Sequence, residues 1–444
     1  MNLNYYYPQI YWGCACLNVN ANAVNEGDYE FLLNEEIMDI EDEEEETKSG
    51  KVAYDKVAEA ISKFTQYKIV PPDINTARMG FIPKVENNEI MFGMKGINKI
   101  GDELILNIIE HRPFSSLKDF TERMVEDGKK LISKDKVINL IKAGCFNQIE
   151  GKSREEIMKD YIGTLVEKHK TLDLRNFLKL IRYDLVPESL NKEKGIYLFT
   201  KEARKNKDGQ GFYLLDDIMV AWYRKWMQQE PLCVDGVYKI NASKWDSIYT
   251  NGLNGARSWI KANKEQLIEI IYNREWKEEW DKYANGDKLQ WELDSMNFYH
   301  SGHPLCNMSF PFDYNSIYDL KENDFDGYWT IKGEQVPKLN LKTIIGTVLI
   351  KNKKQSIITL STPDGIIKVK CYKQQFAKYD KVITDEEEEI IQDSFFEKGV
   401  HLKLTGILRD NMFIPKVYKK NGVEPIERIV LNEEGQFNYL EDKK

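Results

Sequence analysis

Two short glycine-containing turns beside apolar helices have the residue types that bind phosphate. The first spans Gly96 to Gly101, before a predicted helix with apolar residues at helical spacing, Leu104, Ile105, Ile108 and Ile109. The second follows an apolar helix that ends at Ala143-Gly144. A turn that opens a helix presents unpaired backbone N–H groups, which suit a phosphate. The predicted binding residues are Lys95, Gly96, Lys99, Gly101, Lys142 and Gly144.

Two such turns in tandem can hold a DNA backbone without reading bases. The net charge of −9 argues against a nucleic-acid binder, but the charge is unevenly distributed. Acidic runs lie at 41–46 and 385–389, whereas residues 340–384 contain nine Lys and two Asp. Because salt screens charges beyond about 8–10 Å, the local field matters more than the total.

From about residue 340 the apolar pattern changes to a period of two. It predicts five strands with a helix at 373–380 after the third, which is the pattern of an OB fold. The strands are expected at 343–350, 356–361, 365–372, 400–406 and 412–418. Basic and aromatic residues on or near the third strand could bind a single strand, namely Lys368, Lys370, Tyr372 and Lys373. The alternative is a lysine-rich solvated face.

Three motifs, in the same order, resemble the alpha subunit of bacterial DNA polymerase III. They are Pro71-Pro72-Asp73-Ile74-Asn75, Lys142-Ala143-Gly144-Cys145-Phe146 and the segment from Phe298 to Leu305. The resemblance implies the C-terminal part of such a subunit, with fingers, a tandem helix-hairpin-helix and an OB fold. One departure is Lys99-Ile100-Gly101, where the family usually has Gly-hydrophobic-Gly, so we expect the Lys99 charge to contribute to the phosphate grip.

The predicted fold class is a multidomain α+β chain: helical fingers and a tandem helix-hairpin-helix, then a helical insertion and a C-terminal five-stranded OB-fold barrel. The expected domains are partial fingers at 1–90, the helix-hairpin-helix region at 91–160, an aromatic-rich helical insertion at 161–295, a linker with the Ser-Gly-His-Pro-Leu turn at 296–338, the OB fold at 339–432 and a C-terminal tail at 433–444.

Two features could carry other chemistry. Tryptophans in the insertion recur at helical spacing and are expected in the core, although Tyr223-Arg224-Lys225-Trp226 could stack on unpaired bases. His300-x-x-His303-x-x-Cys306 has metal-like spacing, but a closed zinc site needs four ligands and none follows nearby. We therefore predict no metal site.

The resemblance places the catalytic carboxylates of the family in a palm that precedes the fingers. Asp216-Asp217 and Asp324-Phe-Asp326 lack that context. We therefore expect no catalytic residue and no cofactor in this chain. Mg²⁺ is expected in a palm-bearing partner chain, which would complete a DNA-directed DNA polymerase, a nucleotidyltransferase. Such a split replicase fits a bacteriophage genome. The alternatives are a free-standing non-enzymatic DNA-binding accessory protein and a non-functional gene remnant.

The expected partners are DNA, duplex and single-stranded, and the palm-bearing chain. The segment around Gln436, Phe437, Tyr439 and Leu440 resembles peptides that dock in a sliding clamp, while the alternative is a frayed terminus. No secretory signal or membrane span is expected, and the six scattered cysteines suit a reducing compartment. These features predict the cytoplasm, that of the bacterial host for a phage protein.

Overall fold

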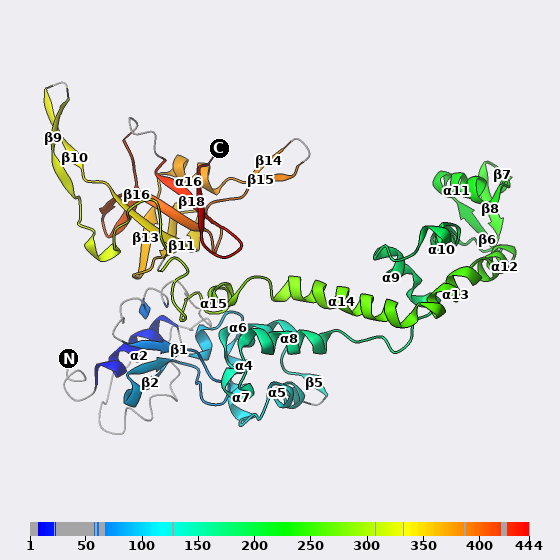
Figure 1. Ribbon diagram of the computed structural model, residues 1–444, viewed down its shortest axis with the longest axis horizontal. Coiled ribbons are helices and arrows are strands. Elements are labelled where there is room, and N and C mark those ends of the chain that lie inside the picture. The colour runs from blue at the N-terminus through cyan, green and yellow to red at the C-terminus, as the bar shows by residue number, and fades with distance from the viewer. Residues whose placement is uncertain are drawn as a thin grey trace, which may run out of the picture. The chain divides into compact units, whose positions relative to one another are not determined.

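The computed structural model describes residues 8–21, 23, 57, 60, 61, 67–126, 128–306, 308–331, 333–385, 388–418 and 424–443. The chain divides into two compact units, which are described separately. The first unit contains Met1–Met158 and Asn285–Lys444, and the insertion unit is Lys159–Ala284. Figure 1 shows the elements of both.

The first unit begins with helix α2 (Gln9–Asn20) and a three-stranded sheet. The sheet consists of β1 (Lys68–Val70), β2 (Ile82–Lys84) and β3 (Glu89–Met91) in the order β1-β3-β2. The β2–β3 turn passes through Asn88, whose φ of 54° suits an asparagine. Trp12 and Val19 on α2 are exposed. The N-terminal tyrosines at 5–7, in the predicted fingers segment at 1–90, lie outside the described residues.

The helix-hairpin-helix region follows the sheet. Its elements are η3 (Met94–Gly96), α4 (Asp102–Glu110), α5 (Leu117–Arg123), β4 (Val125–Glu126), β5 (Lys129–Lys130), α6 (Lys134–Ala143), α7 (Asn147–Glu150) and α8 (Arg154–Leu165). The apolar spacing of the sequence predicts α4 and α6 correctly. Leu104, Ile105 and Ile108 are buried, whereas Ile109 at the end of the same face remains exposed.

A closed barrel forms the C-terminal part of the first unit, and the predicted OB fold is confirmed. Its five strands are β11 (Lys342–Asn352), β12 (Ile357–Ser361), β13 (Ile366–Lys370), β16 (His401–Arg409) and β17 (Met412–Pro415). They pair in the order β11-β12-β13-β17-β16, and β16 pairs back with β11. Among the described barrel strands, the single parallel pairing joins β13 to β17, at Val369 and Phe413. Helix α16 (Lys373–Asp380) follows β13 as predicted.

The barrel sheet is larger than the sequence pattern predicts. β18 (Ile426–Leu431) pairs with the first half of β16, and β19 (Phe437–Glu441) pairs with β18. Phe437–Glu441, part of the separate tail predicted at 433–444, therefore extends the sheet. The barrel core is built from inward side chains such as Val348, Leu360, Val369 and Phe413.

Several elements lie outside the barrel strands. They are α15 (Lys288–Met296), η2 (Val85–Asn87) and η7 (Ile317–Asp319), with two hairpins formed by β9 (Phe325–Ile331) and β10 (Glu334–Leu339), and by β14 (Ile383–Thr384) and β15 (Ile390–Gln392). The sequence assigned α15 to the insertion, but it belongs to the first unit and packs against α6.

The insertion unit is not purely helical. Its helices are η4 (Leu174–Asn176), α9 (Phe177–Arg182), η5 (Glu188–Leu190), α10 (Asn191–Ala203), η6 (Arg204–Asn206), α11 (Asp217–Met227), α12 (Ala242–Gly252), α13 (Asn254–Ala262) and α14 (Lys264–Tyr283). A sheet of β6 (Phe212–Leu215), β7 (Leu232–Val234) and β8 (Val237–Asn241) in the order β6-β8-β7 completes it. Trp245 and Tyr223 are buried in one cluster, so Tyr223 is unsuited to stack on a base.

Within the described part of the chain, no helix is both long and apolar enough to cross a membrane.

Candidate nucleic-acid interface

The first glycine turn presents some of its predicted residues to solvent and buries the others. Lys95 is buried, and its ammonium forms an ion pair with Asp102 at the start of α4. Gly96 is also buried, and a Cβ there would lie 2.5 Å from the Phe92 ring. These two residues shape the turn from inside. A phosphate contact by Lys95 would require its ion pair with Asp102 to break.

Lys99 and Gly101 lie on the surface of the same turn. Lys99 has a φ of 67°, and Gly101 caps α4 with open space beside its Cα. Their exposure leaves room for a phosphate beside the first amides of α4. Asp102 and Glu103 in the first helical turn carry negative charge, which opposes an anion there. A phosphate at this turn would therefore depend on the positive charge of Lys99.

The second turn lies at the C-terminal end of a helix, not at the N-terminal end that suits a phosphate. Gly144 ends α6 with a φ of 89°, and its N–H donates to Ile141 O at 2.9 Å. Gly144 thus lies at a helix C-terminus, where carbonyl groups rather than amides are in excess. Lys142 is buried, with its Nζ 3.3 Å from Asp294 Oδ2. Both predicted residues are already bonded within the protein.

Helix α15 and the residue after it join the two turns to the barrel. The Asn98 N–H donates to Ser295 O at 2.7 Å, and the Asn98 side chain donates to the Asp294 carbonyl. Asn297 donates through Nδ2 to Asn98 Oδ1 at 3.0 Å and accepts from Lys398 Nζ at 2.6 Å. Because Lys398 belongs to the barrel side, Asn297 couples the first turn to the barrel. Burial lowers the pKa of Lys398 to about 8.

A buried ion pair lies behind the second turn. Arg154 Nη1 is 3.0 Å from Glu292 Oε1, and both side chains are almost completely buried. The Arg154 guanidinium also donates to Lys142 O and to His300 Nε2, so His300 carries its proton on Nδ1, which faces Glu292 at 2.8 Å. The guanidinium covers Gly144, where a Cβ would lie 2.8 Å from Arg154 Nε.

Burial and hydrogen bonds shift the pKa values of Arg154 and Glu292. Burial lowers the pKa of Arg154, against the opposing effect of Glu292. Burial also tends to raise the pKa of Glu292, but hydrogen bonds from His300 and Ser301 outweigh it and keep that pKa low. Ser301 donates to Glu292 through both its N–H (3.0 Å) and its Oγ (2.6 Å). The Ser-Gly-His-Pro-Leu turn thereby holds the pair ionised.

The same turn continues into the barrel through histidines. His303 Nε2 donates to Ser361 O at 2.9 Å, and its Nδ1 accepts from the Leu305 N–H at 3.2 Å. Thr347 Oγ1 lies 3.2 Å from His303 Nε2 and 2.7 Å from His401 Nδ1. Burial lowers the pKa of His303 to about 3 and that of His401 to about 4. We call these two the junction histidines, and both are neutral at pH 7.

These hydrogen bonds give His300 and His303 a structural role. Across the part of the chain that the structure describes, no group of three or more His, Cys, Asp or Glu side chains could hold a metal ion. The acidic pairs also serve the fold. Asp216 caps α11 by accepting from the Met219 N–H, and Asp324 and Asp326 pair with Lys342 and Lys338.

The predicted single-strand face lies on the outside of the barrel. Ile367 and Val369 on β13 point inward, so Lys368 and Lys370 point outward. Lys370 Nζ donates to the Gln355 carbonyl. Tyr372 is 63% exposed and caps α16, and Lys373 follows it on the surface. We call Lys368, Lys370, Tyr372 and Lys373 the barrel face.

The predicted clamp-binding residues form part of a strand. Gln436 precedes β19, and its N–H donates to Asn432 Oδ1 at 2.8 Å. Phe437 packs against Phe310 and Phe312 with ring centroids 5.6 and 6.1 Å apart. Leu440 packs on the same cluster, whereas Tyr439 is exposed. A free peptide that offers its apolar residues to a partner is therefore not present in this conformation.

Sequence reasoning missed α15 as the element that connects both turns, and it missed the Arg154–Glu292 pair. Arg154 lies beside Ser153, which forms reciprocal hydrogen bonds with Glu156 at the start of α8, and this local pattern indicates a helix start but not burial. Glu292 offered no signal, because a glutamate in a charged helix usually faces solvent.

Comparison with known proteins supports the assignment of these modules. Residues 66–157 match the family model described as helix-hairpin-helix motif. The chain is 34% identical over 437 residues to a probable DNA polymerase of Bacillus subtilis (strain 168) and to a DNA-directed DNA polymerase of Bacillus phage SPbeta. Each alignment covers 94% of this chain and 32% of the relative, so the chain spans about a third of these relatives.

A shorter alignment reaches the family that the motifs indicate. Over 121 residues, 25% of this chain, the sequence is 34% identical to the DNA polymerase III subunit alpha of Deinococcus radiodurans, of which it covers 9%. The subunit of Thermus aquaticus is 35% identical over 106 residues, which are 22% of this chain and 8% of that subunit. The resemblance to phage and bacterial DNA polymerases, and over a shorter stretch to DNA polymerase III alpha subunits, is confirmed.

Proposed function

We propose that this chain acts as the non-catalytic C-terminal part of a replicative DNA polymerase of the polymerase III alpha type. The 34% identity to DNA polymerases over 94% of the chain carries this proposal. A helix-hairpin-helix region and an OB barrel, joined through α15 and the Ser-Gly-His-Pro-Leu turn, supply two modules suited to nucleic acid.

In this proposal the first turn holds the backbone of duplex product. Lys99 supplies the charge, and the amides at Gly101 and the start of α4 supply donors. Lys95, Gly96, Lys142 and Gly144 keep the shape of the two turns, since their side chains or backbone groups are bonded inside the protein. The barrel face guides the single-stranded template by stacking and charge.

The chemistry would come from a palm-bearing partner chain that holds Mg²⁺ on its carboxylates and activates the primer hydroxyl. This chain would bind and orient the DNA beside it. We do not extend the proposal to the sliding clamp, because the two apolar residues that such a peptide inserts, Phe437 and Leu440, are packed on the barrel.

Reconstitution tests this function. The chain is mixed with the palm-bearing chain from the same genome, and extension of a primed template is measured with each chain alone and with both. We expect the two chains to bind each other and the mixture to extend primers faster than the palm chain alone. If the palm chain neither binds this chain nor gains activity, the proposed polymerase role is wrong.

DNA binding by the chain alone provides the second measurement. For contacts dominated by phosphates, the affinity for duplex falls steeply between low and moderate salt. A salt slope near zero would contradict the proposed backbone grip. Strong DNA binding without any effect on primer extension would instead indicate a free-standing accessory protein.

A further inference from the structure

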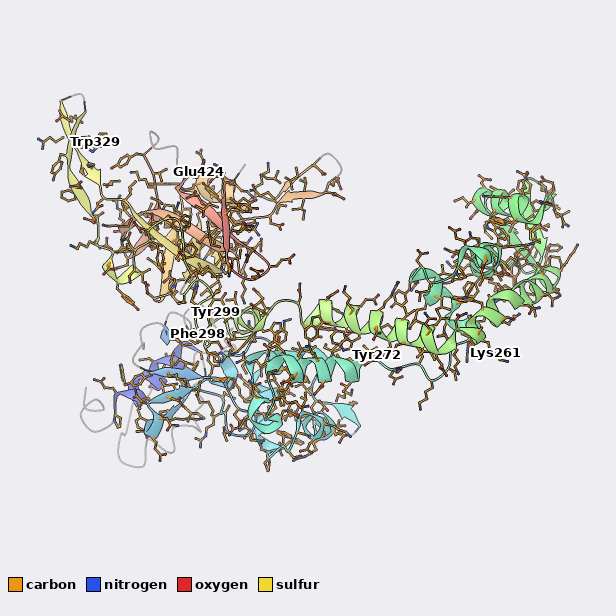
Figure 2. All side chains as sticks on the ribbon, in the orientation of Figure 1. Lys261, Tyr272, Phe298, Tyr299, Trp329 and Glu424 are labelled. Carbon is orange, nitrogen blue, oxygen red and sulfur yellow. The ribbon has the colours of Figure 1, made fainter. Side chains whose placement is uncertain are left out.

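The β9–β10 hairpin exposes aromatic side chains that the proposed function leaves unused. β9 and β10 pair only with each other among the described strands, outside the barrel sheet (Figure 1). Phe325 is 50%, Tyr328 57% and Trp329 41% exposed, and Figure 2 labels Trp329 on this hairpin. The ring centroids of Phe325 and Tyr328 lie 5.6 Å apart, so these two exposed rings adjoin, and contiguous exposed apolar patches mark binding sites.

The hairpin is fixed to the barrel at its base. The Asn323 N–H donates to Leu408 O at 3.0 Å, and Asn340 donates to Asp324 through both N–H (3.1 Å) and Nδ2 (2.8 Å). Tyr418 Oη accepts from the Leu339 N–H at 2.6 Å. The rings of Trp329 and Tyr418 are stacked, with centroids 5.7 Å apart and an interplanar angle of 24°. The base of the hairpin and the Trp329 ring are therefore held in place before any ligand arrives.

Tyr418 connects the hairpin to the barrel face. It follows β17, the strand that pairs with β13, and the exposed Lys416 lies between them in sequence. On α16, Gln375 Nε2 donates to Pro415 O at 3.3 Å, which places the start of α16 beside this segment. The barrel face ends at that same helix start. A path of basic and aromatic residues thus runs from β13 to the hairpin.

The chemistry of this path suits unpaired nucleotides. Proteins bind single strands with aromatic rings on which bases stack and with lysines that follow the backbone. Lysine is depleted from the cores of protein–protein interfaces, so the interleaved Lys416 and Lys338 favour nucleic acid over a protein partner. Lys338 Nζ lies 3.2 Å from Asp326 Oδ2, across the two strands of the hairpin.

We propose that the β9–β10 hairpin is a base-stacking arm, which extends the barrel face so that nucleotides of the single strand stack on Tyr328 and Trp329. This inference rests on the proposed single-strand binding by the barrel, and it assigns further nucleotide sites beyond that face.

The test compares long and short oligo-dT, of about 20 and about 6 nucleotides, bound to the full chain and followed by fluorescence anisotropy. In Tyr328→Ala, loss of one stacking ring is expected to weaken binding of the long oligonucleotide about tenfold. Binding of the short one, which the barrel face accommodates, stays unchanged. The salt dependence also stays unchanged, because no phosphate contact is removed. Tyr328→Phe keeps the ring and restores affinity.

Trp329→Ala is expected to act in the same direction, but it also removes the stack on Tyr418, so Tyr328 is the cleaner site. Tyr439 on β19 is exposed to a similar degree, so Tyr439→Ala is the matched control and should bind like the unaltered chain.

Two negative results are distinguishable. If the unaltered chain binds neither oligonucleotide, the proposed single-strand binding fails and the arm with it. If the chain binds both but Tyr328→Ala and Trp329→Ala bind the long one normally, the arm is refuted while the barrel face stands. The hairpin would then be a protein-docking surface.

Discussion

Loss of the Glu292 carboxylate should strongly destabilise the first unit. The Glu292 side chain is completely buried and pairs with Arg154, which is 2% exposed, at 3.0 Å. Glu292→Gln keeps the size but removes the charge, so the guanidinium stays buried without its counterion. Breaking a buried pair in this way costs about 3–5 kcal/mol. At about 1.4 kcal/mol for each factor of ten, this corresponds to roughly two to nearly four orders of magnitude in a local opening equilibrium.

Hydrogen exchange followed by mass spectrometry measures this effect locally, which matters because a chain with two units need not unfold in one step. In Glu292→Gln, peptides covering residues 134–158 and 288–305 should exchange much faster than in the unaltered chain. Peptides of the insertion unit should not change. Unchanged exchange at 288–305 would refute the view that this ion pair holds α6, α15 and the Ser-Gly-His-Pro-Leu turn together.

Two further variants define the cause. Glu202→Gln removes an exposed pair with Lys205, and such pairs contribute about 0–1 kcal/mol, so it should leave exchange almost unchanged. Replacing both partners, Arg154→Met with Glu292→Leu, removes the buried charges together. Because no unpaired charge remains, the double variant should be less destabilised than Glu292→Gln alone.

Three other outcomes are expected. The junction histidines have folded pKa values below the ordinary 6.5, so their stabilisation is present above pH 6.5 and is lost as the pH falls. Between pH 7 and pH 5, the free energy of unfolding measured in urea should fall by about 2 kcal/mol for each histidine, and a flat pH profile would contradict this. Gly144→Ala should lower the free energy of unfolding by more than the roughly 1–2 kcal/mol of a left-handed backbone, because its new Cβ would meet Arg154. Gly151→Ala, at a position with a φ of 62° and open space, should lower it by only that amount. Equal urea midpoints for the two variants would refute the contact between residue 144 and Arg154. Lys99→Gln should lower the salt slope of duplex binding by about 1 without loss of stability. Lys142→Gln removes the ion pair with Asp294, so it should lower the melting temperature and leave the salt slope unchanged. The reverse result would exchange the roles of the two lysines.

The coupling through Asn297 has a consequence for both modules. Its side chain bonds Asn98 in the first turn and Lys398 beside the barrel. Displacement of one module therefore strains contacts of the other. Under the proposed function, this connection would keep duplex and single-stranded DNA in one register.

The sequence by itself determined the two hairpin helices α4 and α6 and the five barrel strands with their order. Apolar residues at a spacing of 3.6 mark α4 and α6, and alternation marks the five barrel strands, because these periods are local properties of the chain. The motif around Phe298 to Leu305 located the junction between the modules. The family resemblance also came from sequence, since it depends on short motifs in a fixed order.

Only the tertiary structure decided which of the predicted lysines face solvent. Lys142 and Asp294 are 152 residues apart in the chain, so no local pattern could reveal that the ammonium is already paired. The same holds for Arg154 and Glu292, separated by 138 residues. The local sequence around a lysine beside a glycine turn is the same whether its side chain faces a phosphate or a buried carboxylate. The difference arises from α15, which the fold brings against both turns.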